Sequence, residues 1–174
     1  GTKRAGKSII TRINLCYISS FTHYVFLTEQ MNEPINIHHR PYIVMEALCD
    51  TNIPEERVVN AQKLSPRIVM YAGGLYERYG LETLVNAFRK ADVSDSRLVL
   101  YGSGSYVEKL MSICKKDPRI EYRGIAPNET VVQTELEATL LVNPRPTNEE
   151  FTQYSFPSKN MEYMVSGTPV LTTR

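Results

Sequence analysis

The residues best suited to chemistry lie in one stretch, YSFPSKNMEYMVSGTPVL, at residues 154–171. Its apolar spacing predicts a short helix that begins after Phe156, and Ser155 and Ser158 are both available to cap it. The first turn of a helix carries unpaired N–H groups and the positive end of the helix dipole, and Lys159 adds a full charge beside them. This combination favours an anion such as a phosphate or a diphosphate.

Glu162 adds a second kind of contact to this predicted site. It follows Ser158 by four residues and therefore lies on the same face of the helix, one turn deeper. A carboxylate is a poor phosphate ligand, but it accepts hydrogen bonds well from two vicinal hydroxyls, as on a ribose. The combination predicts a nucleotide site. The alternative is an ordinary capped helix whose Glu162 faces solvent, and the spacing alone leaves both interpretations open.

Two glycine turns are expected near this helix. Gly73 and Gly74 follow one apolar run, and Gly102 and Ser103, with a further glycine, follow the next. Glycine permits positive φ and lets a ligand approach the backbone closely. We expect these turns at the same edge of a sheet as the helix, where they would contribute to the same site.

Short apolar runs alternate with helical patterns from residue 67 onward. Such alternation predicts βαβ units and the α/β class, with a Rossmann-like doubly wound parallel sheet whose ligand lies outside the carboxyl ends of the strands. The helical patterns predict buried faces and a capping residue, Asn128, for a third helix. The expected strands are RIVMYAGGL, RLVLYGSG, RIEYRG, TLLVN and TPVLTT, and the expected faces are Leu81, Leu84, Val85 and Phe88, then Val107, Leu110, Met111 and Cys114.

The first 66 residues are less regular. YVFLT and PYIVMEAL are predicted strands, and RINLCYISSF is predicted to form the last part of a helix. A polar segment with two prolines is typical of a linker. We therefore predict three parts: residues 1–50 are the tail of a larger N-terminal domain, residues 51–66 are a linker, and residues 67–174 are a Rossmann-like domain truncated at its C-terminus.

Residues 67–174 resemble the nucleotide-sugar-binding domain of retaining glycosyltransferases with the GT-B fold, the "glycosyl transferases group 1" family. The matching segments are YAGGLYERYGLETLVNAF, LVLYGSGSYVEKL, RIEYRGIAPNETV, ATLLVNPRP and FPSKNMEYMVSGTPVL. The last segment is similar to the part of the family that holds the donor. The resemblance implies that Glu162 binds the ribose hydroxyls, that Ser158 and Lys159 face the diphosphate, and that the turn at Gly124 and Ile125 seats the base.

The resemblance also implies an activity. The whole enzyme is expected to transfer a sugar from a nucleoside-diphosphate sugar to an acceptor glycan or a lipid-linked acceptor, with retention of configuration, as in polysaccharide biosynthesis. The acceptor would be bound by the N-terminal domain, so the 174 residues alone are expected to be inactive. No cofactor or metal is implied, and the cytoplasm, or the membrane surface for the full-length protein, is the expected location. The alternative is a catalytically silent nucleotide-binding or interaction domain.

Three positions depart from the family pattern. The family has an arginine and a lysine on the donor phosphates where this chain has Gly74 and Tyr79, and a carboxylate where it has Tyr154. The loss of two cations favours the silent alternative. Arg145 and Lys159 are the candidate substitutes for the lost cations.

Composition and motifs exclude several other functions. The formal net charge of +1 gives no electrostatic case for nucleic acid, and no apolar run approaches the length of a membrane span. Three scattered cysteines favour a reducing compartment over a disulfide framework. GTKRAGKS, at residues 1–8, has P-loop spacing, but no apolar strand precedes it, as a P-loop requires. We interpret it as a basic lead-in to a helix, with a P-loop nucleotidase as the third alternative.

Overall fold

The computed structural model describes residues 13–48, 62–147 and 150–173. The chain divides into two compact units: Gly1–Leu48 with Glu150–Phe156 form unit 1, and Cys49–Glu149 with Pro157–Arg174 form unit 2. The P-loop-like residues 1–8 and most of the predicted linker lie outside the described residues. No helix in the described part of the chain has the length and apolar character that a bilayer crossing requires.

Unit 1 is built on a small parallel sheet. Residues 13–18 are helical. The two strands that the apolar runs predict, β1 (Tyr24–Phe26) and β2 (Tyr42–Val44), pair with each other. Between them lie the 3-10 helix η1 (Glu29–Met31) and the one-turn helix α2 (Asn32–Ile35).

A second segment, distant in sequence, joins this small unit. The 3-10 helix η3 (Glu150–Tyr154) contacts η1, and the Thr28 hydroxyl donates a 2.9 Å hydrogen bond to the Gln153 carbonyl oxygen. The sequence division placed residues 150–156 with the donor domain, whereas this contact groups them with residues 1–48.

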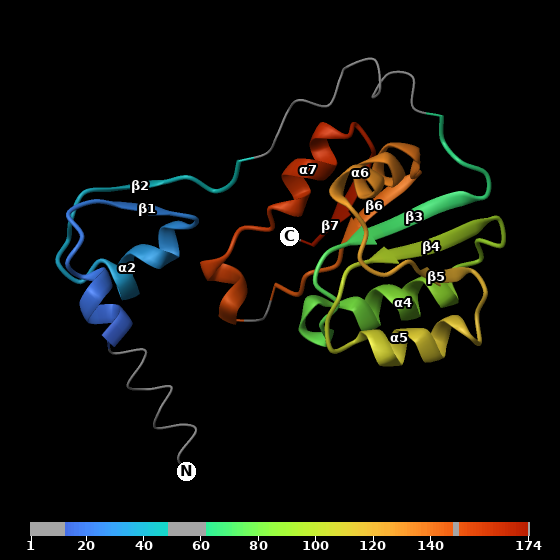
Figure 1. Ribbon diagram of the computed structural model, residues 1–174, viewed down its shortest axis with the longest axis horizontal. Coiled ribbons are helices and arrows are strands. Elements are labelled where there is room, and N and C mark those ends of the chain that lie inside the picture. The colour runs from blue at the N-terminus through green and yellow to red at the C-terminus, as the bar shows by residue number, and fades with distance from the viewer. Residues whose placement is uncertain (1–12, 49–61, 148–149, 174) are drawn as a thin grey trace, which may run out of the picture. The chain divides into compact units, whose positions relative to one another are not determined.

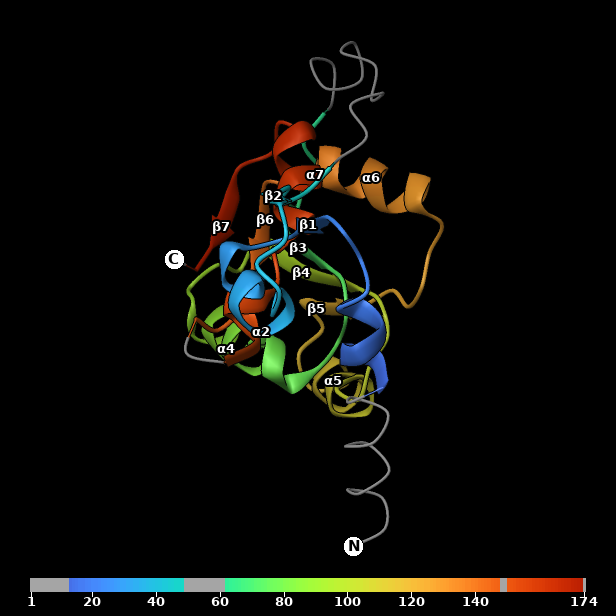
Figure 2. The ribbon, with the colours of Figure 1, turned by 90° about the vertical axis from the view of Figure 1, so that its left-hand side faces the viewer.

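Unit 2 contains a five-stranded, all-parallel sheet in the order β5-β4-β3-β6-β7. Figure 2 shows these strands side by side between two layers of helices. This α/β fold is the Rossmann-like doubly wound sheet that the sequence predicts. The chain order of the strands reverses between β3 and β6, so the carboxyl ends of the strands beside that point offer a crevice for a ligand. The strands are β3 (Arg67–Ala72), β4 (Ser96–Tyr101), β5 (Ile120–Tyr122), β6 (Leu140–Asn143) and β7 (Val170–Thr172).

Helices cover both faces of this sheet (Figure 1). On one face, α4 (Leu81–Lys90) and α5 (Val107–Cys114) pack against β3, β4 and β5. On the other face, α6 (Asn128–Glu137) and α7 (Lys159–Val165) pack against β3, β4 and β6. A 3-10 turn, η2 (Glu77–Tyr79), precedes α4. Apolar residues cover both faces, which explains why the strands are almost wholly apolar.

The helix faces are confirmed in α4 and only partly in α5. Leu81, Leu84, Val85 and Phe88 are all buried in α4. In α5 only Leu110 is fully buried, and the prediction for Met111 is wrong, since it is 49% exposed. Asn128 does not cap α6 but is its first residue, because Pro127 occupies the capping position.

Candidate functional site

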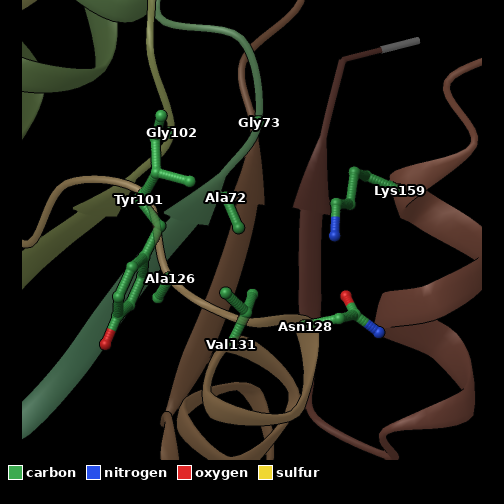
Figure 3. Close-up of a pocket in the computed structure, with 9 residues that line it drawn as sticks. Ala72, Gly73, Tyr101, Gly102, Ala126, Asn128, Val131 and Lys159 are labelled. Carbon is green, nitrogen blue, oxygen red and sulfur yellow. The ribbon is translucent and has the colours of Figure 1, made fainter.

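A pocket of about 200 Å³ lies at the carboxyl edge of the sheet, beside the point where the strand order reverses. Figure 3 shows residues from the ends of β3 and β4 on one side, α6 below, and Lys159 of α7 on the other side. The lining residues are Ala72, Gly73, Tyr101, Gly102, Ile125, Ala126, Asn128, Val131 and Lys159. Most of the lining is apolar, and Lys159 supplies its one positive charge, so the pocket suits a ligand with a flat apolar part and an anionic part.

Backbone hydrogen bonds fix the turns around this pocket. The Gly73 N–H donates to the Tyr101 carbonyl oxygen (3.1 Å), and the Gly102 N–H donates to the Gly124 carbonyl oxygen (2.8 Å). Gly102 has a φ of +129°, and a Cβ there would lie 1.8 Å from the Gly73 carbonyl oxygen. Only glycine permits this approach. These bonds hold together the two turns that the glycine pattern predicts and add a third turn, at Gly124, which that pattern did not include.

Tyr163 holds α7 against the end of β3. Its ring is fully buried, its hydroxyl accepts from the Ala72 N–H (2.9 Å), and it donates to the Ala72 carbonyl oxygen (3.3 Å). Burial raises the pKa of this hydroxyl, so it stays protonated and keeps both contacts. The first turn of α7 is thus positioned at the rim of the pocket.

Lys159 and Glu162 form an ion pair at this rim. The Lys159 ammonium donates to Glu162 Oε2 at 2.7 Å and lies 3.8 Å from Oε1 of Glu135, a residue of α6. Glu135 is wholly buried. Its burial is the main cause that raises the pKa of its carboxyl to about 7, and the negative charge of Glu162 adds to the rise. The positive charge of Lys159 opposes both. The sequence prediction did not include Glu135. Its position four residues after the buried Val131 placed it on the inner face of α6, which was a usable signal.

Of the two caps predicted for α7, Ser158 has the predicted position but not the side-chain hydrogen bond, and Ser155 is not a cap. The helix begins at Lys159, and Ser158 occupies the capping position without a side-chain hydrogen bond to the helix. Ser155 instead donates to the carbonyl oxygen of Phe151 (3.0 Å). Because α7 has only seven residues, its dipole is a minor source of positive potential compared with the Lys159 ammonium.

Arg145 lies in a different cluster, with tyrosines of the turn after β3. Its guanidinium lies 5.7 Å from the centre of the Tyr79 ring, and the ring also contacts Arg78 at 5.3 Å. A Cβ on Gly74 would lie 3.0 Å from the Tyr79 ring, so the aromatic side chain fills the space that a larger residue at position 74 would need. The Tyr71 hydroxyl donates to the Gly74 carbonyl oxygen at 2.9 Å. Burial raises the pKa of this hydroxyl to about 12, and the positive charge of Arg145 opposes the rise.

Some of the predicted site residues line the pocket or lie beside it, and others belong to different clusters or to unit 1. Gly73, Gly102, Ile125 and Lys159 line the pocket, with Glu162 beside them. Gly124 and Ser103 contribute backbone carbonyl oxygens that hold the turns. Gly74 and Arg145 lie around Tyr79, and Tyr154 and Ser155 belong to unit 1.

Metal-binding side chains do not cluster in the described part of the chain. No group of three or more histidine, cysteine, aspartate or glutamate residues there could hold a metal ion.

The family model described as "Glycosyl transferases group 1" matches residues 66–174. Comparison with curated proteins gives no match.

Several solved structures have a similar fold. Sucrose-phosphate synthase from Thermosynechococcus elongatus has a TM-score of 0.67 and 18% identity, and the match covers 92% of this chain and 43% of that one. The pneumococcal O-GlcNAc transferase GtfA, in complex with UDP and GlcNAc, has a TM-score of 0.64, 16% identity and coverages of 92% and 31%. Anabaena HepE in complex with UDP has a TM-score of 0.61, 15% identity and coverages of 91% and 47%. The chain therefore spans less than half the length of each.

Proposed function

Because the chain belongs to the glycosyl transferases group 1 family, we propose that it binds the nucleotide-sugar donor of a glycosyltransferase. The whole protein would transfer the sugar to an acceptor glycan or a lipid-linked acceptor, with retention of configuration and without a metal. The observation that carries this proposal is the pocket at the carboxyl edge of the sheet, in which an apolar wall faces the Lys159 ammonium. Two of the three structures named above contain UDP, which supports a nucleoside diphosphate as the ligand.

Each part of the donor has a proposed partner. The base would lie against Ile125 and Ala126, where the lining is apolar. The ribose hydroxyls would donate to Glu162, and the diphosphate would lie beside Lys159, whose side chain is 33% exposed. Lys159 and Glu162 contact each other at 2.7 Å. The ligand would break this contact, with its diphosphate binding Lys159 and its ribose binding Glu162.

In this reaction the bond between the sugar's anomeric carbon and the diphosphate oxygen breaks. A new bond forms to the acceptor oxygen, whose proton is released to solvent, and the nucleoside diphosphate leaves with one additional negative charge. A fixed cation beside the leaving oxygens stabilises that charge as it develops, and Lys159 is the side chain in the pocket that can do so. The acceptor and the catalysed transfer belong to the whole protein, and the 174 residues alone would bind the donor without transferring the sugar.

A nuclear magnetic resonance titration with UDP, GDP and ADP tests the proposal. We expect amide shifts at the ends of β3 and β4, at residues 123–128 and at the start of α7. Glu162→Gln should weaken the binding of nucleotide and nucleoside alike, since a charge-assisted hydrogen bond contributes on the order of 1.5–3 kcal/mol. Shifts confined to the amino-terminal edge of the sheet, or unchanged binding by Glu162→Gln, would contradict the assignment.

A second candidate is a nucleotide-binding domain without catalytic activity. The Tyr79 ring and the small Gly74 stand where the family resemblance implies cations, and this observation favours it. Assay of sugar transfer by the full-length protein separates the two, because both candidates bind nucleotide and only the enzyme releases free nucleoside diphosphate in the presence of acceptor.

A further inference from the structure

Glu135 is a buried carboxylate that the proposed function does not use. Its side chain is wholly inaccessible to solvent, and neither carboxylate oxygen has a hydrogen-bond partner. Nearly all buried polar groups in folded proteins have such a partner, and an ionised carboxylate is costly to bury without one. Its nearest positive charge is the ammonium of Lys159, 3.8 Å away and inclined toward Glu162. Such a group is either neutral or shares that ammonium.

The charges around Glu135 come mainly from α7. That helix presents Lys159, Glu162 and the hydroxyl of Tyr163, while the β3 side chains on this face of the sheet are apolar. Lys63, from the segment before β3, directs its ammonium to the end of α6, where it donates to a backbone carbonyl oxygen at 2.8 Å. One ammonium therefore faces two carboxylates, and Oε1 of Glu162 is also buried without a hydrogen bond.

Lys159 belongs to both this cluster and the pocket. It lines the pocket, as Figure 3 shows, and its ammonium is shared unequally between Glu162 at 2.7 Å and Glu135 at 3.8 Å. We propose that Glu135 is a positioning residue for Lys159, and that an arriving nucleotide diphosphate draws the ammonium to its phosphate oxygens while Glu135 takes up a proton from solvent. This inference rests on the proposed function, because it requires a diphosphate beside Lys159.

The direction of the proton movement follows from the charges. Burial and Glu162 already raise the pKa of Glu135 to about 7, and only Lys159 opposes them. Moving the ammonium away and bringing an anion closer both disfavour the ionised form, so the pKa rises further when the ligand binds. By linkage, a ligand that raises this pKa binds more tightly at low pH. Donor affinity should therefore fall as the pH rises from 6 to 8.

The first test needs no ligand. Carbon-13 resonances of glutamate carboxyls, followed from pH 4 to 9 in the 174-residue chain, should show one group that titrates near pH 7 and is missing from Glu135→Gln. Lys159→Met should move that titration to higher pH, and Glu162→Gln should move it to lower pH. If all glutamates titrate in their ordinary range, or if the two variants leave the midpoint of the Glu135 titration in place, the cluster does not work as proposed.

The second test measures protons taken up on binding. UDP-glucose, GDP-mannose and ADP-glucose have no phosphate that titrates between pH 6 and 8, so calorimetry in two buffers of different ionisation enthalpy counts protons from the protein. With whichever of the three binds most tightly, we expect an uptake of up to about half a proton at pH 7 and about fivefold weaker binding at pH 8 than at pH 6. In Glu135→Gln both effects should disappear. Glu137→Gln, on the same helix but hydrogen-bonded to Gln133, should behave like the unaltered chain.

The possible failures are distinct. Binding of a nucleotide sugar without proton uptake, or with the same pH dependence in Glu135→Gln, would overturn the role of Glu135 and leave the proposed function intact. Binding of none of the three would overturn the proposed function and this inference together.

Discussion

At the scale of single residues, the structure distinguishes the two candidate cations of the site. Lys159 lines the pocket, whereas Arg145 stacks on Tyr79 in the turn after β3. We predict that Lys159→Met weakens binding of UDP tenfold or more and leaves binding of uridine nearly unchanged, because only the diphosphate contacts the ammonium. Arg145→Met should have a smaller effect in the same direction. Calorimetric titration of both variants with both ligands is the measurement, and equal losses for UDP and uridine would mean that neither residue binds phosphate.

Glu135 also predicts how the stability of the fold depends on pH. The pKa of this carboxyl is about 7 in the folded chain and 4.5 ordinarily, so the folded state holds the proton more tightly. Below pH 4.5 both states are protonated and Glu135 has no effect. As the pH rises from about 4.5 to about 7, the unaltered chain loses roughly 3 kcal/mol of unfolding free energy from this group, and the loss is constant at higher pH. Urea unfolding at pH 5 and pH 8 should show that Glu135→Gln loses less stability over this range than the unaltered chain does. A parallel decline in both would place the titration elsewhere.

At the scale of helices and strands, much of unit 2 could be predicted from local patterns, and the errors arose where tertiary contacts decide. The apolar spacing of α4 identified its buried face, since four regularly spaced side chains have no other stable place. In α5 the same rule failed for Met111, because the neighbouring elements cover only part of the predicted face. The spacing of Glu135 after Val131 indicates that it faces inward, but its contact with Lys159 joins two helices. The Tyr79–Arg145 contact likewise joins segments far apart in sequence, so no spacing within one segment indicated either contact.

Two tyrosines allow a matched test of how α7 is positioned. The Tyr163 hydroxyl bonds both backbone groups of Ala72, while the hydroxyl of the equally buried Tyr106 has no hydrogen-bond partner. Tyr163→Phe leaves the buried Ala72 N–H without its acceptor and should lower the unfolding free energy by about 1–3 kcal/mol. Tyr106→Phe removes an unsatisfied polar group and should be neutral or stabilising. Thermal unfolding of the pair is the measurement, and similar losses in both would show that the Ala72 contacts do not stabilise α7.

At the scale of the whole molecule, the chain is not partitioned as its sequence order indicates. Residues 150–156 follow β6 of the large sheet and precede α7, yet they group with residues 1–48. Two members of the predicted site, Tyr154 and Ser155, therefore belong to unit 1, while the pocket is lined wholly by residues of unit 2. Local sequence could not indicate this grouping, because the contact that defines it joins residues 125 positions apart.

The hydrogen bond from Thr28 to the Gln153 carbonyl oxygen makes this partition testable. Thr28→Val keeps the shape of the side chain and removes the donor, so the contact between η1 and η3 should weaken by about 0.5–1.5 kcal/mol. We predict faster hydrogen exchange at residues 150–156 and unchanged exchange in β3, β4 and β6, because the large sheet makes its own hydrogen bonds and has its own core. Thr22→Val is the matched control, since the Thr22 hydroxyl contacts only the adjacent His23 among the described hydrogen bonds. Mass spectrometry of exchanged peptides measures both variants. Faster exchange that spreads through the sheet would mean that residues 150–156 are part of the large unit after all.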